Sequence, residues 1–307
     1  MARLTLLLPA TTRFAGHPLP PALARALGRA DRAQHDAGEF AQLARHLTLL
    51  PLGWPAAALT RLLDTGEGDA RQGAWLRADP AHVRPDINGA RLLGVGATVG
   101  MDQADVEALL PALRPLFGDA GLRLDAPHPA RWYLRLSPGT PMPMFSSPDK
   151  ALGDDVFDHA PRGEAARRWR ALESEVQITL HNHPHNAARL ASGRVPINSL
   201  WFWGGGALPD AVSATLPTVL SDDPAVRGAA RLGKLQGMPL PASLPAHGDA
   251  LVDLRGQRDR RSLVEHWLLP ALAGGEATFD FADGVVFALR SSQRWRVWRR
   301  PLAAFAA

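Results

Sequence analysis

Proline and glycine divide this chain of 307 residues into short segments, because it holds 27 prolines and 28 glycines. Proline has no backbone N–H to donate and glycine favours turns, so both interrupt regular structure. The apolar run at residues 4–8, for example, ends at Pro9. That run is too short for a signal-peptide core, and no apolar stretch approaches the ~20 residues that a membrane-spanning helix needs. We therefore expect a cytoplasmic protein with no membrane partner.

The composition is that of an ordinary folded protein. Hydrophobic residues make up 46% of the sequence and charged residues 21%, which is typical of globular domains. The length corresponds to roughly two domains or one large domain. The chain has no cysteine, which excludes disulfides, a thiolate nucleophile and metal sites with cysteine ligands.

The basic residues are almost all arginines. Lys and Arg total 34 against 30 Asp and Glu, a formal net charge of +4, and the only lysines are Lys150 and Lys234. The arginines are spread from Arg3 to Arg300 among acidic residues. Because nucleic-acid-binding proteins usually concentrate basic residues on one face, we expect no nucleic-acid partner.

The spacing of apolar residues predicts short strands and helices along the first half of the chain. One helix, at 37–50, rests on Phe40, Leu43, Leu47 and Leu50, which are three and four residues apart. Asp102 is expected to cap the helix that follows it. The remaining expected elements are strands at 3–8 and 130–136, helices at 21–30, 55–63 and 101–117, and extended pieces at 75–97 with a turn at Asn88-Gly89.

In the second half, a proline-rich connector at 137–158 precedes the clearest helix of the chain, at 163–181. The face of that helix expected to be buried consists of Trp169, Leu172, Val176 and Leu180. Beyond it we expect a short helix at 185–192, a strand at 197–203 that runs into three glycines, a strand at 250–254, a helix at 262–272, and a C-terminal antiparallel meander at 277–281, 284–290 and 294–300.

Three histidines fall within five residues, at His181, His183 and His185. On a strand this spacing would place all three rings on one face, as in a metal site. The preceding helix and the intervening Pro184 favour instead a capped helix end with some histidines hydrogen-bonded, because helical spacing spreads the rings around the axis. We expect no metal here, and the metal site is the alternative.

The segment 198–209 contains three glycines after an apolar strand, where backbone N–H groups could approach an anion. Polar residues that suit a carboxylate or phosphate lie just before it. The alternative for the glycines is a tight turn without a ligand. The alternative for Asn198 and Arg189 is that their side chains satisfy buried backbone groups. The candidate ligand-binding residues are His183, Asn186, Arg189, Asn198, Gly204, Gly205 and Gly206.

A second polar segment, at 77–86, contains Asp79, His82 and Arg84 between prolines. Arg84 and His82 could contribute to binding an anionic substrate. A polar connection without a binding role is the equal alternative. We add Arg84 to the candidate ligand-binding residues and assign no catalytic residue, because no Ser-His-Asp set or G-x-S-x-G turn is recognisable.

The stretch HNHPHNAARLASGRVPINSLWFWGGGALP, at 181–209, resembles the archaeal-type cofactor-independent phosphoglycerate mutases. WLRADPAHVRPD at 75–86 is similar to that family's approach to its inserted domain, and RGAARLGKLQGMPLP at 227–241 to its Gly-Met segment. The chain is more similar still to the RpfE-type regulatory proteins. The resemblance covers about residues 75–240.

The resemblance implies the alkaline-phosphatase-like superfamily: a reduced α/β/α core with an inserted α+β subdomain and a two-metal phosphoryl-transfer site. We expect the α/β core at 1–75 and 160–307, and the inserted subdomain with its connector at 76–159. The sequence departs from the family where the metals would bind. Pro9 follows the first strand in place of the family's Asp-Gly, and the strand ending at Asp253 is followed by no histidine ligand.

We therefore expect a cytoplasmic RpfE-type regulatory protein that lacks the two-metal site and has no cofactor. It would bind a small phosphorylated or carboxylated metabolite at the candidate residues, or a regulatory protein partner. One alternative is an active phosphoglycerate mutase or related phosphatase with two divalent metals such as Mn²⁺. The other is a structural or regulatory interaction module without a ligand.

Overall fold

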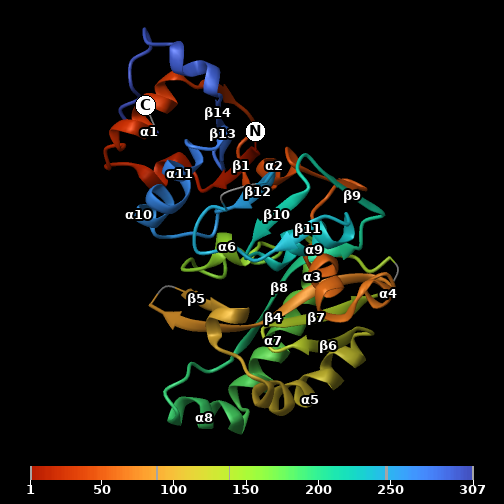
Figure 1. The fold of residues 1–307 in the computed structure, drawn as a ribbon. Coiled ribbons are helices and arrows are strands. Elements are labelled where there is room, and N and C mark those ends of the chain that lie inside the picture. The colour runs from red at the N-terminus through yellow and green to blue at the C-terminus, as the bar shows by residue number, and fades with distance from the viewer. Residues whose placement is uncertain (1, 88, 138, 246–247, 306–307) are drawn as a thin grey trace. The chain divides into compact units, whose positions relative to one another are not determined.

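The computed structural model describes residues 2–87, 89–137, 139–245 and 248–305 (Figure 1). The chain divides into two compact units. Unit 1 consists of residues 1–53 and 209–307, and unit 2 consists of residues 54–208. One unit is therefore inserted into the sequence of the other. In the part of the chain that the structure describes, no helix is both long and apolar enough to cross a membrane.

Unit 1 is an α/β fold, as expected from the resemblance. Seven of its described strands form one sheet in the order β11-β10-β12-β1-β13-β14-β2, in which the first five run parallel and the last two antiparallel to their neighbours. The strands are β1 (Ala2–Leu8), β2 (Asp31–Gln34), β10 (Thr218–Ser221), β11 (Gln236–Met238), β12 (Ala250–Asp253), β13 (Gly275–Phe281) and β14 (Val285–Leu289).

Both faces of β1 are buried, because Leu6 and Leu7 point to opposite sides of the sheet and both are fully inaccessible. Leu6 lies in a core that includes Leu27 of α1 and Trp267 of the C-terminal helical segment. The described helices of unit 1 are α1 (Pro21–Arg29), α2 (Glu39–Ala44), α9 (Pro224–Leu232), α10 (Arg260–Ser262), a π-helical turn (Leu263–Leu268), α11 (Leu269–Ala271) and two 3-10 helices (Thr11–Phe14 and Ser291–Trp295).

Two expected elements of unit 1 are wrong. Residues 37–50 form α2 followed by β3 (Leu47–Leu50), which pairs antiparallel with β9 (Ala211–Ala214). Alternating burial of Leu47 and Leu49 fits a strand, and pairing with a distant segment overrides the helical spacing. The third strand of the meander, expected at 294–300, is absent from the described residues, where the chain forms a 3-10 helix and turns. The second neighbour of β14 is β2.

Unit 2 is built on an antiparallel sheet around the long strand β4 (Ala74–Asp86). One edge of β4 pairs with β8 (Ser199–Ala207), and its other pairs are with β7 (Arg131–Leu136) and β5 (Gly89–Val95). β6 (Arg123–His128) completes the sheet beside β7. The extended pieces expected at 75–97 are confirmed as β4 and β5, whereas Asn88 of the expected turn lies outside the described residues.

Helices pack on both faces of this sheet. Apolar side chains of α5 and α7, such as Leu113 and Val176, form one core with Trp132 and Phe202 of the sheet. On the opposite face, Arg77 of β4 bonds Thr60 of α3. The described helices are α3 (Ala56–Thr65), α4 (Glu67–Ala70), a 3-10 helix (Gly96–Val99), α5 (Gln103–Asp119), α6 (Pro148–Ala151), α7 (Ala166–His181) and α8 (Pro184–Ala191).

Unit 2 is larger than the inserted subdomain expected at 76–159. It also contains α3, α7, α8 and β8, because β8 pairs with β4 and α7 shares a core with α5. The predicted cap of α5 is confirmed: the side chain of Asp102 accepts the backbone N–H of Asp105 at 2.9 Å. The buried face predicted for the helix at 163–181 is confirmed as well.

Candidate functional site

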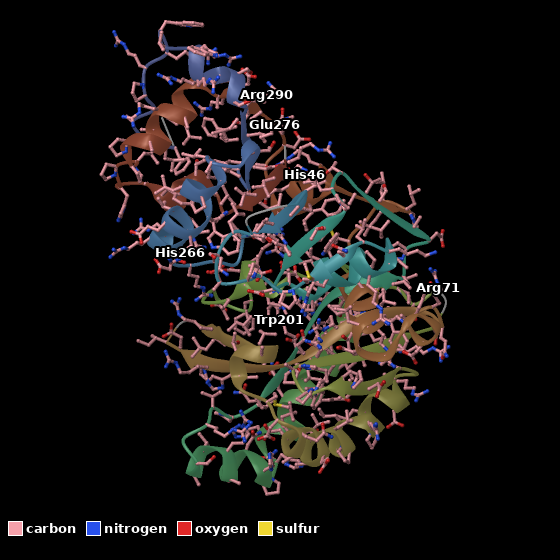
Figure 2. All side chains as sticks on the ribbon, viewed as in Figure 1. His46, Arg71, Trp201, His266, Glu276 and Arg290 are labelled. Carbon is pink, nitrogen blue, oxygen red and sulfur yellow. The ribbon has the colours of Figure 1, made fainter. Side chains whose placement is uncertain are left out.

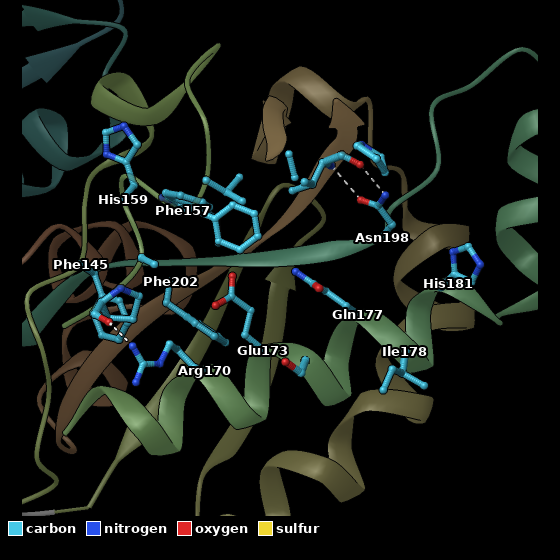
Figure 3. Close-up of a pocket in the computed structure, with 18 of the residues that line it drawn as sticks. Phe145, Phe157, His159, Arg170, Glu173, Gln177, Ile178, His181, Asn198 and Phe202 are labelled. Atoms are coloured by element: carbon cyan, nitrogen blue, oxygen red, sulfur yellow. Dashed lines mark hydrogen bonds between the residues drawn. The ribbon is translucent and has the colours of Figure 1, made fainter. Parts of the chain in front are cut away.

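A cavity of about 530 Å³ lies in unit 2 beside α7. Figure 3 shows α7 along one wall and β8 along another, with Trp201 and Phe202 of β8 among the lining residues. Trp201 lies in the middle of unit 2 in Figure 2. The α7 residues that face the cavity are Arg170, Glu173, Ser174, Gln177, Ile178 and His181.

The proline-rich connector forms a third wall. It lacks long regular elements, as expected, and is held by specific bonds: Trp201 Nε1 donates to the carbonyl of Ser146 at 2.9 Å, and the N–H of Val156 donates to the carbonyl of Ala90 at 2.8 Å. The ring of Phe145 packs against that of Phe202 in a tilted arrangement, with 6.0 Å between the ring centroids. The cavity is therefore bounded by aromatic side chains and ordered backbone.

Glu173 is the acidic side chain of this cavity. In Figure 3 its carboxyl group points from α7 into the space below Phe157. Burial raises its pKa to about 7, and no neighbouring charge or hydrogen bond offsets this effect. Glu173 thus holds a carboxyl group that is poorly solvated and, among the described residues, unpaired.

Several other polar side chains of the cavity have partners. Arg170 Nη1 donates to the carbonyl of Pro161 at 3.4 Å, and His159 Nε2 lies 3.1 Å from Asp154 Oδ2. Gln177 Nε2 is 3.5 Å from the hydroxyl of Ser199. These bonds hold side chains at the rim of the cavity. No counter-charge or hydrogen bond from the described residues compensates the burial of Glu173.

The three histidines at 181–185 serve different roles. His181 is the last residue of α7 and lines the cavity. His183 is the N-cap of α8, where its Nδ1 accepts the N–H of His185 at 3.2 Å. His185 Nε2 lies 2.7 Å from Asp105 Oδ1. Within the described ranges, no group of three or more His, Asp or Glu side chains is placed to hold a metal ion.

Asp105 joins α5 to the segment that contains the candidate residues. Its fully buried carboxylate accepts bonds from His185, Arg189 and Arg194. Burial opposes ionisation, but the hydrogen bonds from the backbone of Asp102, from His185 and from Arg189 outweigh it, so the pKa of Asp105 lies far below its usual range. Asp105 therefore organises the start of α8.

Three of the candidate ligand residues satisfy backbone groups. Asn186 Nδ2 donates to the carbonyls of Leu180 and Ile197, at 2.7 and 2.8 Å. Arg189 donates to the carbonyls of Val99 and Val195 in addition to Asp105. Asn198 bonds both backbone groups of Val83, as a strand residue would. Their geometry matches the alternative in which these side chains stabilise buried backbone.

The glycines expected as a loop continue the strand β8. Gly204 and Gly206 have φ values of +66° and +146°, which side chains rarely adopt. A Cβ at Gly204 would lie 2.9 Å from the Cβ of Ala56, and one at Gly206 would lie 2.8 Å from the Cβ of Pro55. These two glycines permit close approach of β8 to α3, and Gly205 lies between Leu76 and Met142.

The polar residues at 77–86 separate onto different sides of β4. Asp79 is buried and accepts two bonds from Arg77 and one, of 2.7 Å, from Trp203 Nε1. His82 Nδ1 lies 3.0 Å from the carbonyl of Pro196. Arg84 is exposed, and its neighbours Val83 and Pro85 line the cavity, so its side chain points away from it.

In unit 1, acidic side chains lie where two parallel strands end. Asp253 is the last residue of β12. Arg255 donates to its carboxylate through Nε and Nη2, at 2.7 and 2.9 Å, and the hydroxyl of Ser221 donates to it at 2.8 Å. Asp280 of β13 is bound by Arg45 in the same two-pronged manner and by His46 Nε2 at 2.7 Å. Figure 2 labels His46.

These residues do not fit the two-metal site that the resemblance implies. Metal ligands must be deprotonated and free to coordinate, whereas both buried carboxylates bind guanidinium groups. Burial opposes ionisation of Asp253, but the charge and hydrogen bonds of Arg255 outweigh it and hold its pKa below the usual range. The positive charge beside each carboxylate comes from the protein itself.

Comparison with known proteins links part of the chain to one family. A segment of 62 residues, 20% of this chain, is 42% identical to a probable 2,3-bisphosphoglycerate-independent phosphoglycerate mutase of Geobacter sulfurreducens. The same length is 34% identical to the corresponding mutase of Methanothrix thermoacetophila. In both cases the segment spans 16% of the relative's length. No family model matches the chain.

Solved structures that align with the chain include a cofactor-independent phosphoglycerate mutase from Thermoplasma acidophilum. It is 17% identical, with a TM-score of 0.42, and the alignment covers 94% of this chain and 89% of that one. A protein from Pyrococcus horikoshii is 11% identical, with a TM-score of 0.48 over 98% of this chain and 90% of that one. The chain is thus similar to phosphoglycerate mutases in part of its sequence.

Sequence reasoning missed Glu173 and Asp105. For Glu173 a signal was present: Arg170, Gln177 and His181 lie on the same side of α7, next to its buried apolar face. Such a polar stripe is usually solvated. For Asp105 the only role visible in the sequence was a position in the first turn of a helix. Its contacts with α8 come from a segment about eighty residues away.

Proposed function

We propose that this chain is a cytoplasmic regulatory protein of the RpfE type, related to phosphoglycerate mutases, that does not perform two-metal phosphoryl transfer. It would act by binding a small metabolite or a protein partner. The observation that supports this proposal is the pairing of Asp253 with Arg255 at the end of β12. Two-metal phosphoryl transfer needs carboxylates that coordinate metal cations, which in turn activate a nucleophile. Here the guanidinium of Arg255 occupies both carboxylate oxygens of Asp253.

The pairing at Asp253 is not isolated. Arg255 also lies 3.6 Å from Asp223 and 3.7 Å from Glu39, so one buried arginine faces three carboxylates. Asp280 is bound by Arg45 in the same way. Arginine keeps its charge at every accessible pH, so these carboxylates remain neutralised without a bound ion.

The test combines metal analysis with an activity assay on the purified full chain. After incubation with Mn²⁺ and removal of free ions, we expect no stoichiometric metal and no conversion of 3-phosphoglycerate to 2-phosphoglycerate above the buffer rate. Stoichiometric Mn²⁺ together with turnover that disappears in Asp253→Asn would instead establish an active mutase.

The binding half of the proposal has its own measurement. A ligand that binds the folded state raises apparent stability, so a thermal-shift screen of phosphorylated and carboxylated metabolites should identify one. Binding of such an anion at His183, Gly204 and Arg84 stays a prediction from the sequence. At Asn186, Arg189 and Asn198 an anion would have to displace existing backbone hydrogen bonds. If no metabolite raises the melting temperature, the interaction module is the better description.

A further inference from the structure

We propose that the cavity beside α7 binds a small organic cation, with its charged amine or amidine against Glu173 and its apolar body against Phe145, Trp201 and Phe202. This inference concerns unit 2 alone, since every lining residue falls within 54–208. It goes beyond the proposed function and does not depend on whether the strand ends of unit 1 hold metals.

The size and lining of the cavity suit a small organic molecule. Its volume of about 530 Å³ falls within the range of about 300–1,000 Å³ that is usual for small-molecule sites. Such sites combine apolar walls with a few polar groups that orient the ligand. The apolar and aromatic lining residues include Val83, Val156, Phe145, Phe157, Trp201 and Phe202.

The carboxyl group of Glu173 is poorly solvated. A carboxylate removed from water is costly unless a cation or hydrogen-bond donors replace its hydration. Neither is supplied to Glu173 by the described residues, and burial alone shifts its pKa. A bound ammonium group would supply both charge and N–H donors. An anion would add repulsion to the existing cost.

Aromatic residues also line the cavity. Cations are attracted to the faces of Trp and Phe rings, most strongly where water is excluded. Trp201 and Phe202 both line the cavity from β8, and Phe145 contacts Phe202. A ligand amine can therefore contact a carboxylate and aromatic rings together, while its carbon body fills the apolar space.

Glu173 is not the only titratable group near the ligand. Arg170 lines the cavity from one turn earlier on α7, His181 lies at the end of the same helix, and His159 lies on the connector, paired with Asp154. Arg170 directs its guanidinium to the carbonyl of Pro161, away from Glu173 in Figure 3. The experiment must separate the titration of Glu173 from that of the two histidines.

The test titrates the full chain with three probes of similar shape: 2-phenylethylamine, 2-phenylethanol and 3-phenylpropanoate. Binding is followed by calorimetry and by the fluorescence of Trp201 and the other tryptophans. At about pH 8, where Glu173 is ionised, we expect the amine to bind about tenfold more tightly than the alcohol, and the carboxylate to bind most weakly. The preference for the amine should vanish in Glu173→Gln.

Glu175→Gln is the matched control, because Glu175 lies on the same helix, is exposed and does not line the cavity. It should bind the amine as the unaltered protein does. Circular dichroism of Glu173→Gln checks that this isosteric change leaves the fold intact.

The pH dependence of binding distinguishes a cationic ligand from a neutral ligand that takes up the proton of Glu173. Amine affinity should rise between about pH 5.5 and about pH 8 as Glu173 ionises, and this rise should be lost in Glu173→Gln. Three results would overturn the proposal: no saturation by the amine at millimolar concentrations, equal affinity for all three probes, or a pH dependence that persists in Glu173→Gln and so belongs to His159 or His181.

Discussion

Arg255 grips both carboxylate oxygens of Asp253, with Nε 2.7 Å from Oδ1 and Nη2 2.9 Å from Oδ2. Both side chains are buried, at 9% and 4% exposure. In a buried ion pair each charge is stabilised by its partner instead of by water. Removal of one partner therefore leaves the other charge buried and uncompensated. The same relationship recurs between Arg45 and Asp280.

Replacing Arg255 should destabilise unit 1. In Arg255→Gln the carboxylate of Asp253 loses its counter-charge, and we expect the free energy of unfolding to fall by about 3 kcal/mol. Urea denaturation followed by circular dichroism measures this change. The double variant Arg255→Gln, Asp253→Asn should recover part of the loss, because it removes the stranded charge. A single variant as stable as the parent would show that Arg255 does not compensate Asp253.

Arg189→Ala should reduce stability rather than ligand affinity alone. Arg189 is 1% exposed and bonds Asp105 and two backbone carbonyls. Its removal leaves these acceptors unsatisfied, so we expect a loss of about 3–5 kcal/mol by urea denaturation. Arg189→Lys should restore little, because lysine lacks the planar fork. The control Arg84→Ala removes an exposed arginine, and it should stay within about 0.5 kcal/mol of the parent.

Acid should weaken unit 1 through Asp280. Burial opposes ionisation of Asp280, but hydrogen bonds from Arg45 and His46 outweigh it, so its pKa in the folded state is below the ordinary value. A lowered carboxyl pKa stabilises the fold above the unfolded pKa of about 3.9, and that stabilisation is lost as pH falls further. We expect the unfolding free energy to decline below about pH 4, and to decline less in Asp280→Asn. Parallel curves for the two proteins would contradict this assignment.

Gly204→Ala should destabilise unit 2 by about 1–3 kcal/mol, since it combines a positive φ with a contact of 2.9 Å to Ala56. Thermal unfolding gives the comparison. Gly68→Ala is the control, because Gly68 lies in α4 with open space around it, and alanine favours a helix by up to about 1 kcal/mol. If Gly204→Ala is as stable as the parent, the close approach of β8 to α3 is not required.

Glu173→Gln should stabilise the protein at alkaline pH. The pKa of Glu173 in the folded state is raised to about 7, so the folded form keeps a proton that the unfolded chain releases near its ordinary value. Stability is therefore lost as pH rises from about 4.5 to about 7, and the full penalty applies above that. Because Glu173 is only partly buried, we expect Glu173→Gln to gain about 1–3 kcal/mol at pH 8 and little at pH 4. A gain that does not depend on pH would exclude this cause.

Local patterns predicted the elements whose stability is local. The apolar face of α7 and the Asp102 cap of α5 are legible in the sequence because helical spacing and capping involve residues within a few positions of each other. Residues 47–50 were misassigned because Leu47 fits a helical spacing, and only the pairing of Leu49 with Val212 on β9 decides for a strand.

The candidate site was harder to predict for the same reason. Polar residues near the glycines suggested an anion site, but whether Asn186 and Arg189 face a ligand or a carbonyl depends on where Val99, Ile197 and Asp105 lie in space. The importance of Glu173 depends on the connector that covers it. The sequence gives the chemical type of each side chain. The solvation of that side chain and its hydrogen-bond partners are determined only by the folded structure.

The contact between Gly206 and Pro55 joins the two ends of unit 2. Pro55 is the second residue of unit 2, and Gly206 is close to its last residue. The first and last segments of unit 2 therefore lie next to each other. Unit 2 also has an apolar core of its own. Domain insertion is tolerated where the two ends of the inserted portion are close together. We therefore expect that a short linker can replace unit 2 while the sheet of unit 1 still forms.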